Sequence, residues 1–489
     1  MEKLGIPTVE MLYADQANYF KQIALNNGCP NIRYVAVPRI GHAEEIIATY
    51  YDKIIKALTD PLTAKEKEAG LYSPSAPPRV LFEGTLLEAQ EFLGQTVLVE
   101  NCRNCPIAKY TDGLPVVIPT EEAVAAMLTG TSHKASEQVV TPYEMPGFFG
   151  PATPAGAAIT FAQKYTSTVE KVAICAVMAG CKPQYLPVAL AIATSGGGTT
   201  NCPGTSSMAT TLYIVSGPIA KEIGMNAGQN SMDVGNPANM TLGRVGALIS
   251  VNFGGCITGL VRTDSGNPVH SVCTAEDLEG LPPGWIGFNE ESTYMKDGKP
   301  VNYTKNQSVV GKGFSWGLAS GFFSFPGYYR SMNEGQMGIA RYLGVEGKPG
   351  YYNWMEAILP IIVRAMPSPS SGFFILHMNL AQMLYLYGFK TKAAVYKWMF
   401  DTYFVTVKEY WNSGLYDFMT DGGRMTEPTS GKTYIDLLKT DPGYKLHVFG
   451  GFGDPNANCI IVGDSFADEH WYWNIFGFRP STYAIDPWK

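Results

Sequence analysis

The chain has 489 residues, of which 46% are hydrophobic and 16% are charged, and its formal charge is −7. This composition excludes a disordered or fibrous chain, and the acidic charge, without any dense Lys/Arg run, excludes an electrostatic footprint for nucleic acid. A chain of this length is expected to form two or three domains, and it shows no internal repeat. Because the sequence has no signal peptide and no run of about 20 apolar residues, we expect a cytoplasmic protein with no membrane partner.

Residues 1–75 are predicted to form a partial α/β domain. Strands are expected at 5–12 and 32–37 and helices at 15–25 and 42–58, which is the βαβα order of half a doubly wound sheet. Parallel strands need neighbours and helices on both faces, so we expect this Rossmann-like domain to be incomplete. The charged and then Pro/Ser-rich passage 65–78 is the expected linker.

Residues 76–280 are predicted to form a central, larger α/β domain. Ser167 and Glu170 have the spacing of a capping box, which predicts the start of a helix, and Gly180 predicts its end. The other elements predicted here are strands at 79–82, 96–100 and 211–216, helices at 86–93, 120–130, 184–193, 218–224 and 237–253, and a surface connection or lid at 141–154.

Residues 281–489 are predicted to be a mainly helical extension. Residues 282–305 are polar and irregular, whereas 351–366, 374–387 and 392–411 have helical patterns. The end of the chain is expected to form a strand–loop–strand unit over 444–462. The sequence therefore predicts an α/β fold, with an incomplete Rossmann-like N-terminal domain and a larger α/β domain carrying helical insertions.

Two polar loops in the central domain are candidate contacts for a ligand. The segment 195–207 is rich in Gly, Ser, Thr and Asn, whose consecutive N–H groups and hydroxyls can hold a carboxylate or phosphate. A packed Gly-rich turn explains it equally well. The second polar loop is 226–231, and Asn236 and Asn239 follow it as further amide side chains that could bind a ligand. Helix capping alone explains Asn236. The predicted substrate-binding residues are Ser195, Gly197, Thr199, Thr200, Asn201, Asn226 and Asn230.

The nine cysteines are an odd number spread thinly over a long chain, which favours free thiols over a disulfide framework. Cys102 and Cys105 have the spacing of a redox dithiol after a predicted strand. Two packed thiols, or half of a zinc site, fit the same spacing, and no second CxxC exists to complete a four-cysteine site. Cys202 is a candidate nucleophile if its pKa is depressed.

Histidines offer weaker candidates for acid–base chemistry. His133 is a candidate base or ligand, although a polar histidine after a helix is more often bonded locally. His270 lies near Cys273 and Glu276. The loop 450–458 lacks a full GxGxxG pattern, so we read it as a turn, and we assign His470, among tryptophans, to packing. No metal site is predicted, and the cofactor is unknown.

Several passages together resemble the UGSC family, named for a selenocysteine-Gly-Ser-Cys motif that often occurs as Cys-Gly-Ser-Cys. The N-terminal passages resemble the end of the UGSC domain, and the others resemble the second domain that accompanies it; residues 280–440 carry little of the likeness. The passages are Gly5-Ile-Pro-Thr-Val9, Asn31-Ile-Arg-Tyr-Val-Ala-Val-Pro38, Ala126-Met-Leu-Thr-Gly-Thr-Ser-His133, Thr168-Val-Glu-Lys-Val-Ala-Ile174, Ala176-Val-Met-Ala-Gly-Cys-Lys-Pro-Gln-Tyr-Leu-Pro187, Gly217-Pro-Ile-Ala-Lys-Glu-Ile-Gly224 and Asn239-Met-Thr-Leu-Gly-Arg-Val-Gly246.

The sequence departs from this family because the Sec/Cys-Gly-Ser-Cys motif, expected before Gly5, is absent. A late start codon, a split gene whose partner chain carries the motif, or a loss of thiol chemistry would each explain the difference. The resemblance implies a selenoprotein homologue with redox or thiol-dependent, oxidoreductase-type chemistry. From the polar loops and the composition we expect a cytosolic enzyme that acts on a small polar or anionic metabolite.

Two alternatives to thiol chemistry stay open. One is a cofactor-free hydratase or lyase that uses His133 or His270 for proton transfer. The other is a non-catalytic subunit, either a homo-oligomer or one bound to a partner chain that completes the N-terminal domain.

Overall fold

An apolar stretch at the centre of the chain forms helix α6 (Leu186–Thr194), and all of its residues are buried. A helix that is apolar all round needs neighbours on every side. The structure, a computed structural model, describes residues 4–38, 40–68, 70, 78–99, 104–145, 153–161, 165–196, 208–254, 272–316, 322–324, 359, 363, 371–413, 423–450, 453–463, 470–475 and 479–489.

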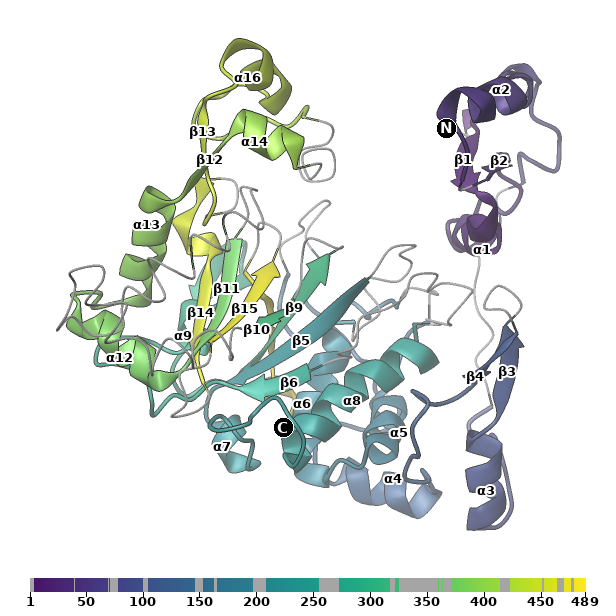
Figure 1. Ribbon diagram of the computed structural model, residues 1–489. Helices are drawn as coiled ribbons and strands as arrows, with labels where there is room; N and C mark the ends of the chain where they lie inside the picture. Colours follow the sequence, from purple (N-terminus) through teal and green to yellow (C-terminus); the bar gives the residue numbers. More distant parts are fainter. Residues whose placement is uncertain are drawn as a thin grey trace.

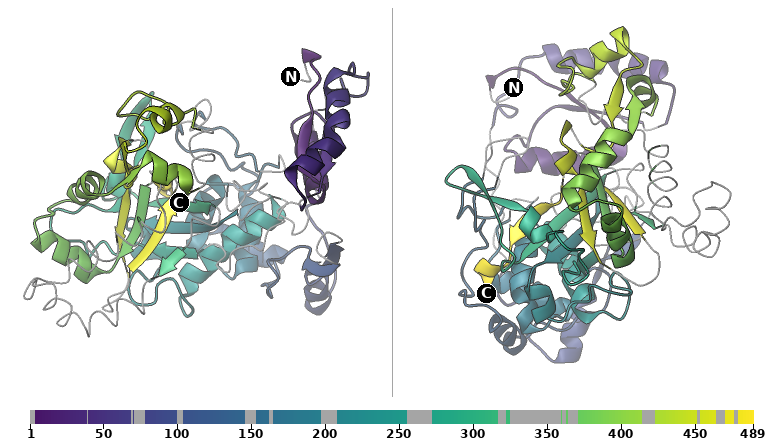
Figure 2. Two further views of the ribbon diagram at one scale, coloured as in Figure 1. Left: turned by 45° about the horizontal axis from the view of Figure 1, so that its top comes forward. Right: turned by 90° about the vertical axis from the view of Figure 1, so that its left-hand side faces the viewer.

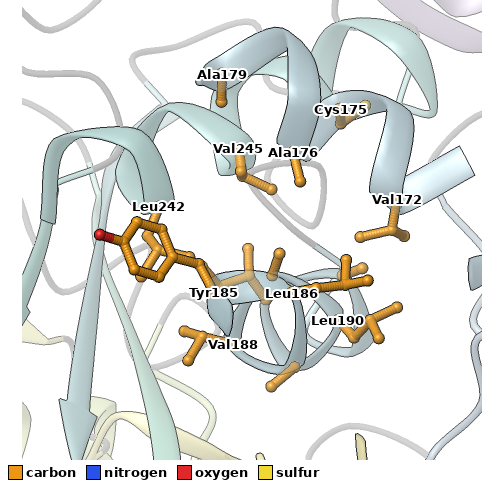
Figure 3. Packing of buried hydrophobic residues seen from close by; sticks show 14 of the residues in the cluster. Val172, Cys175, Ala176, Ala179, Tyr185, Leu186, Val188, Leu190, Leu242 and Val245 are labelled. Atoms are coloured by element: carbon orange, nitrogen blue, oxygen red, sulfur yellow. The ribbon is translucent and has the colours of Figure 1, made fainter. Parts of the chain in front are cut away.

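Two helices cover one side of α6. These are α5 (Val169–Ala179) and α8 (Pro237–Asn252), and both bury most of their residues. Figure 3 shows Ala176 of α5 and Val245 of α8 directed toward Leu186 of α6. The predictions of helices at 184–193 and 237–253 are therefore confirmed.

Helix α5 begins one residue later than its sequence pattern predicts. Thr168 is the N-cap, because its side chain accepts a hydrogen bond from the backbone N–H of Lys171, whereas the buried Ser167 bonds to the Thr168 carbonyl. The capping box assigned to Ser167 and Glu170 is thus wrong. The stop at Gly180 is confirmed, since its φ of +86° is the left-handed conformation that glycine adopts without strain.

The helix layer lies on a mixed four-stranded sheet. Strand β5 pairs parallel with β6 and antiparallel with β9, and β9 pairs antiparallel with β16. The strands, in sheet order, are β16 (Ser481–Ala484), β9 (Val309–Trp316), β5 (Met208–Ser216) and β6 (Val272–Ala275). Alternation along β5 sends Tyr213 and Val215 into the helix layer and Leu212 and Ile214 to the opposite face.

A second mixed sheet covers that opposite face. Phe373 and Ile375 join the same buried cluster as the residues of β5, whereas Phe374 and Leu376 pack on α12 (Met378–Leu386) and α13 (Lys392–Thr402). Its strands, in sheet order, are β10 (Phe322–Ser324), β15 (His470–Ile475), β11 (Ser371–Leu376) and β14 (Cys459–Val462). The core is therefore helix, sheet, sheet, helix, and Figure 1 shows these layers side by side.

The C-terminal region departs from its predicted helical character, because the described part of 281–489 contains strands β7 to β16. The predicted helix 374–387 begins as β11, a fully buried strand. The predicted helix 392–411 is divided into α13, strand β12 (Phe404–Thr406) and α14 (Val407–Asn412). Apart from residues 359 and 363, the helix predicted at 351–366 lies outside the described residues.

Other C-terminal predictions are also corrected. The passage 282–305 contains helix α9 (Phe288–Glu291) and the hairpin β7 (Thr293–Lys296) and β8 (Lys299–Asn302), so it is not irregular. The two strands predicted in 444–462 are confirmed as β13 (Lys445–His447) and β14, but they lie in different sheets, because β13 pairs with β12 and β14 pairs with β11. The other elements of the chain from residue 183 onward are α7 (Ile219–Glu222), α16 (Tyr434–Thr440), and the 3-10 helices η4 (Pro183–Tyr185), η8 (Pro455–Ala457) and η9 (Asp486–Trp488).

The N-terminal residues form a small unit that stands away from the sandwich in Figure 1 and in the left view of Figure 2. Strands β1 (Glu10–Tyr13) and β2 (Tyr34–Val37) are parallel, as a βαβ unit requires, and within the described residues they form a two-stranded sheet. The connecting helices are η2 (Ala14–Gln16) and α1 (Ala17–Asn26), and α2 (Ala43–Thr59) follows. No residue of α2 is buried.

The segment between this unit and the sandwich contains two short helices and a hairpin. Helix α3 (Leu86–Leu93) has the bounds that its sequence predicts, and α4 (Glu121–Leu128) begins after the N-cap Thr120. Strands β3 (Thr96–Val99) and β4 (Cys105–Ala108) pair antiparallel. Residues 79–82 form no strand, which corrects that prediction.

The described helices include none with the length and apolar character needed to cross a lipid bilayer.

Candidate functional site

A buried lysine lies where α6 ends and the Gly/Ser/Thr/Asn segment begins. Lys312, on β9, is 3% exposed, and its Nζ donates a hydrogen bond to the backbone carbonyl of Ser195 at 3.0 Å. It faces the helix layer because it lies two residues from Val310, a member of the α5–α6–α8 core. Burial lowers the pKa of Lys312 to about 7, because removal from water disfavours the ammonium form.

A cavity of about 210 Å³ opens beside this lysine, at the edge strand β16. Thr194, next to Ser195, lines it, and so does Ser481, which is in register with Lys312. The cavity wall therefore includes the cross-strand partner of Lys312 and the residue that precedes its hydrogen-bond partner Ser195. Its other walls come from 142–145, from the α9–β7 segment, and from Tyr303 and Arg479.

Three tyrosines gather on one side of the cavity. The ring centroids of Tyr143 and Tyr294 are 4.2 Å apart with the rings stacked, and Tyr303 lies 4.8 Å from Tyr294. Burial raises the pKa of Tyr143 and of Tyr303, with smaller contributions from neighbouring groups. These phenols therefore keep their protons at neutral pH and can donate hydrogen bonds.

Behind the cavity, charged side chains alternate in sign through the interior. Lys392 Nζ lies 2.8 Å from Glu276 Oε1 and 3.6 Å from Glu291 Oε2, and Arg479 lies 3.1 Å from the same Glu291 oxygen. Lys392 is 1% exposed. Although burial alone would lower the pKa of Lys392, the charges of Glu276 and Glu291 raise it, so the amine stays protonated.

Hydrogen bonds from Ser216 and Phe288 hold the Glu276 carboxylate in place. Its Oε2 accepts hydrogen bonds from the Ser216 hydroxyl at 2.7 Å and from the Phe288 backbone N–H at 2.6 Å. Ser216 ends β5, and Glu276 follows β6, so the carboxylate sits at the carboxyl ends of a parallel strand pair. This places a satisfied charge pair, rather than an orphaned charge, between the two sheets.

The polar segment predicted to bind substrate is described only at its start. The Ser195 hydroxyl bonds back to the Ile192 carbonyl at 2.6 Å, and its side chain is buried, so the group that faces Lys312 is its backbone carbonyl. The other predicted contacts of this segment, Gly197, Thr199, Thr200, Asn201 and the candidate nucleophile Cys202, lie outside the described residues.

Asn226 and Asn230 serve to fold their own loop. The Asn226 amide bonds to the Gln229 carbonyl and to Asn236 Oδ1, and the Asn230 amide bonds to the Val234 carbonyl. Asn239 also binds Asn226 backbone atoms. The Asn236 side chain makes no capping bond to α8, so its assignment to capping alone is wrong. These amide contacts hold the turn together.

His133 binds the end of the chain. Its Nδ1 lies 2.8 Å from Glu137 Oε1 and its Nε2 lies 2.7 Å from the Pro487 carbonyl, so both ring nitrogens face acceptors. Burial alone would lower the pKa of His133, but these two contacts raise it overall. The ring also packs on Trp488 at 4.9 Å. These contacts give His133 a local structural role.

Of the candidate dithiol, only Cys105 lies within the described residues. Cys105 is exposed and starts β4, opposite Val99 of β3, whereas Cys102 lies outside the described residues. The motif follows a strand, as expected, but leads into another strand. Cys175 and Cys459, in contrast, are buried, and burial raises the pKa of each thiol to about 12. Cys273 is buried beside β5, and His270, its predicted neighbour, lies outside the described residues.

Within the described ranges, no three His, Cys, Asp or Glu side chains are grouped as metal ligands. No protein-family model, curated protein or solved structure matches the chain.

Sequence reasoning missed Lys312, Lys392, Glu291 and Arg479. Lys312 had a usable signal, since it is the single charged residue in an apolar and Gly-rich strand, Val309-Val-Gly-Lys-Gly313. A lysine in a strand usually marks the face of the strand that is exposed to solvent. Lys312 is buried only because the helix layer covers that face of β9. The other three are brought together from distant parts of the chain.

Proposed function

We propose that the protein is an enzyme that acts on a small polar or anionic metabolite and that Lys312 is its acid–base group. The observation that carries this proposal is the 3.0 Å contact between the Lys312 amine and the Ser195 carbonyl. It places a buried amine at the entry to a segment rich in backbone N–H and hydroxyl donors, beside a cavity of about 210 Å³. A buried amine near neutrality can both take and return a proton.

The reaction class that needs least from the site is a hydratase or lyase step. The proton of the carbon next to the substrate carboxylate passes through one water to the neutral Lys312 amine, which lies behind the cavity wall, and that C–H electron pair becomes the new C=C bond. The C–O bond to a neighbouring hydroxyl breaks, and the hydroxyl leaves as water with the proton that Lys312 had taken. Atoms and charge balance without an added oxidant or reductant.

This step replaces His133, the base first considered for such chemistry, with Lys312. Both ring nitrogens of His133 face the acceptors Glu137 and Pro487 at 2.8 and 2.7 Å, so the ring is occupied in holding the chain end. Lys312 instead lies beside a cavity.

Proton exchange with deuterated water tests this proposal without knowledge of the natural substrate. Small hydroxy and keto carboxylates are incubated with the protein in D2O, and loss of a C–H signal is followed by proton NMR. We expect exchange with the wild-type protein and at least a 100-fold loss in Lys312→Met, a magnitude typical of removing an acid–base group. Exchange that is absent from the wild type, or unchanged in Lys312→Met, would contradict it.

Thiol-dependent chemistry of the UGSC type is a second candidate function. It is supported by the exposed position of Cys105 at the start of β4. The Rossmann-like character of the N-terminal unit is part of the same proposal, and the parallel pairing of β1 and β2 supports it. Cys105→Ser is the matching variant in the exchange experiment: loss of turnover there, with Lys312→Met active, would favour the thiol mechanism.

A non-catalytic subunit is the third candidate. Helix α2 has no buried residue, and Ile47 and Tyr51 on it are 55% exposed, which supports a partner surface on the N-terminal unit. Size measurement of the purified chain tests this candidate: a lone monomer without bound protein would contradict it.

A further inference from the structure

We infer that the cavity beside β16 is a carboxylate subsite, with Arg479 as the anion-binding group and the tyrosines as the wall for a flat, apolar body. The ligand class is therefore a small aromatic or unsaturated carboxylate. This inference deepens the proposed function and rests on it for the identity of the cavity as a substrate site, but binding can be measured separately from any reaction.

Arg479 has hydrogen-bonding capacity left over. A guanidinium carries five N–H donors. Within the described residues, Arg479 makes one bond of 3.1 Å to Glu291 and one long contact of 3.5 Å to the Asn456 carbonyl. Its side chain is 23% exposed and lines the cavity. Donors therefore remain for a ligand, and their fork matches the two oxygens of a carboxylate.

The charged groups behind Arg479 form a balanced network. Glu291 is its ion-pair partner, but the same Glu291 oxygen also faces Lys392 at 3.6 Å. Tyr396 adds a neutral hydroxyl donor to Glu291 at 3.3 Å. Glu276 is the nearer partner of Lys392 at 2.8 Å, so two carboxylates balance two cations in this network. A ligand carboxylate would therefore be recognised by the remaining N–H donors of the guanidinium, in charge-assisted hydrogen bonds, rather than by a net positive charge.

The guanidinium is also held in a fixed orientation. Its central carbon lies 5.9 Å from the ring centroids of both Phe288 and Tyr396. These rings restrict its rotation, and the Glu291 bond fixes one edge. A preorganised fork loses little rotamer entropy when a ligand binds, which favours affinity for a small molecule.

The tyrosine wall determines what the rest of the ligand resembles. Tyr143 and Tyr294 stack at 4.2 Å, with an interplanar angle of 27°, and Tyr303 inclines toward Tyr294. A flat ring or conjugated chain can extend such a stack. The volume of about 210 Å³ is below the range of drug-sized pockets, so it selects a small molecule.

Glu144 also lines the cavity and makes a cation the main competing ligand. It lies opposite Met295 in an isolated bridge, whereas Arg479 lies at Glu291. Glu144 and Arg479 thus reach the cavity from different segments of the chain. An ammonium ion over the tyrosine rings would be balanced by the Glu144 carboxylate.

Calorimetric titration of the full chain separates these ligands. The probes are benzoate, its neutral analogue benzamide, and tetramethylammonium. We expect benzoate to bind, benzamide to bind at least tenfold more weakly, and tetramethylammonium to show no binding in the same range. Equal binding of benzamide, preferential binding of tetramethylammonium, or no binding of benzoate to the wild type would overturn the inference.

Variants assign the binding to this cavity. Arg479→Gln and Tyr294→Leu should each weaken benzoate at least tenfold, and Arg479→Lys should recover part of the loss because it keeps the charge without the fork. Tyr294→Leu leaves the buried ion network intact, so it guards against misfolding of the arginine variants. The matched control is Lys299→Gln, which removes an exposed positive charge from the adjacent strand β8. Benzoate affinity unchanged in both Arg479→Gln and Tyr294→Leu would overturn the assignment.

The Lys312→Met protein distinguishes this inference from the proposed function. It should bind benzoate as the wild type does, because Lys312 does not line the cavity. If the wild-type protein binds benzoate but shows no proton exchange, the carboxylate subsite is supported and the proposed reaction is contradicted. If it shows proton exchange but does not bind benzoate, the proposed reaction is supported and the subsite is contradicted.

Discussion

Lys392 and Glu276 form an ion pair of 2.8 Å between two side chains that are 1% and 0% exposed. Lys392 comes from the first turn of α13, outside the second sheet, and Glu276 follows β6 in the first sheet. The pair therefore joins the two halves of the sandwich at its interior. A charge in such a place is stable only while its partner is present.

Removal of one partner of this pair should destabilise the protein strongly. Lys392→Met leaves Glu276 without its cation, and we expect a loss of about 3–5 kcal/mol in the free energy of unfolding. Urea denaturation followed by circular dichroism measures it. Lys397→Met, which breaks an exposed pair with Asp401 on the same helix, is the control and should cost less than about 1 kcal/mol. Similar losses for the two variants would contradict a buried ion pair.

Asn239 should prove structural rather than ligand-binding. It is 2% exposed, and its side chain accepts from the Asn226 N–H and donates to the carbonyls of Asn226 and Ser231. Asn239→Ala leaves buried backbone groups unpaired, so we expect a loss of about 1–3 kcal/mol per group in a denaturation experiment. The exposed Asn302→Ala is the control, and an equal effect there would refute this role.

His133 should make stability depend on pH. Its pKa is raised in the folded protein by the Pro487 carbonyl and the Glu137 carboxylate, against the lowering effect of burial. A raised folded-state pKa stabilises the protein fully below the unfolded value of about 6.5, and the contribution disappears as pH rises through the folded-state pKa. Melting temperatures measured from pH 5.5 to 8.5 should therefore fall less steeply in His133→Gln. Identical slopes in the two proteins would contradict the contact.

Thiol labelling should separate the cysteines sharply. Burial raises the pKa of Cys175 and Cys459 to about 12, so few thiolates form there at neutral pH, whereas Cys105 is exposed. Iodoacetamide at pH 7.5, followed by peptide mass spectrometry, should modify Cys105 in the native protein and the two buried thiols only after denaturation. Native modification of Cys175 at the rate of Cys105 would show that the helix layer opens.

Sequence patterns predicted the central part of the fold well because its elements carry their own boundaries. Thr85 and Glu88 form the capping box of α3, and Asn236-Pro237 precedes α8. The apolar run 371–386 carries no such boundary. A fully buried strand and a buried helix look alike in periodicity, so β11 was read as part of a helix. The second sheet consequently could not be predicted.

The break between α13 and α14 has a local signal in the sequence. Thr406 and Glu409 form a capping box in the structure, and this spacing marks a new helix start inside the predicted helix 392–411. The sequence carries fewer local signals for the candidate site. Glu291, Lys392 and Arg479 are 101 and 87 positions apart in sequence, and only the stacking of the sheets brings their charges together.

The most direct test of the account is the titration of the Lys312 amine. In protein labelled with 15N-lysine, the Nζ signals are followed by NMR between pH 5 and 10. We predict one signal with a midpoint near pH 7, which disappears in Lys312→Met, because burial lowers the pKa of this amine to about 7. If every lysine signal titrates above pH 9, or if the near-neutral signal persists in Lys312→Met, Lys312 is not the acid–base group of this protein.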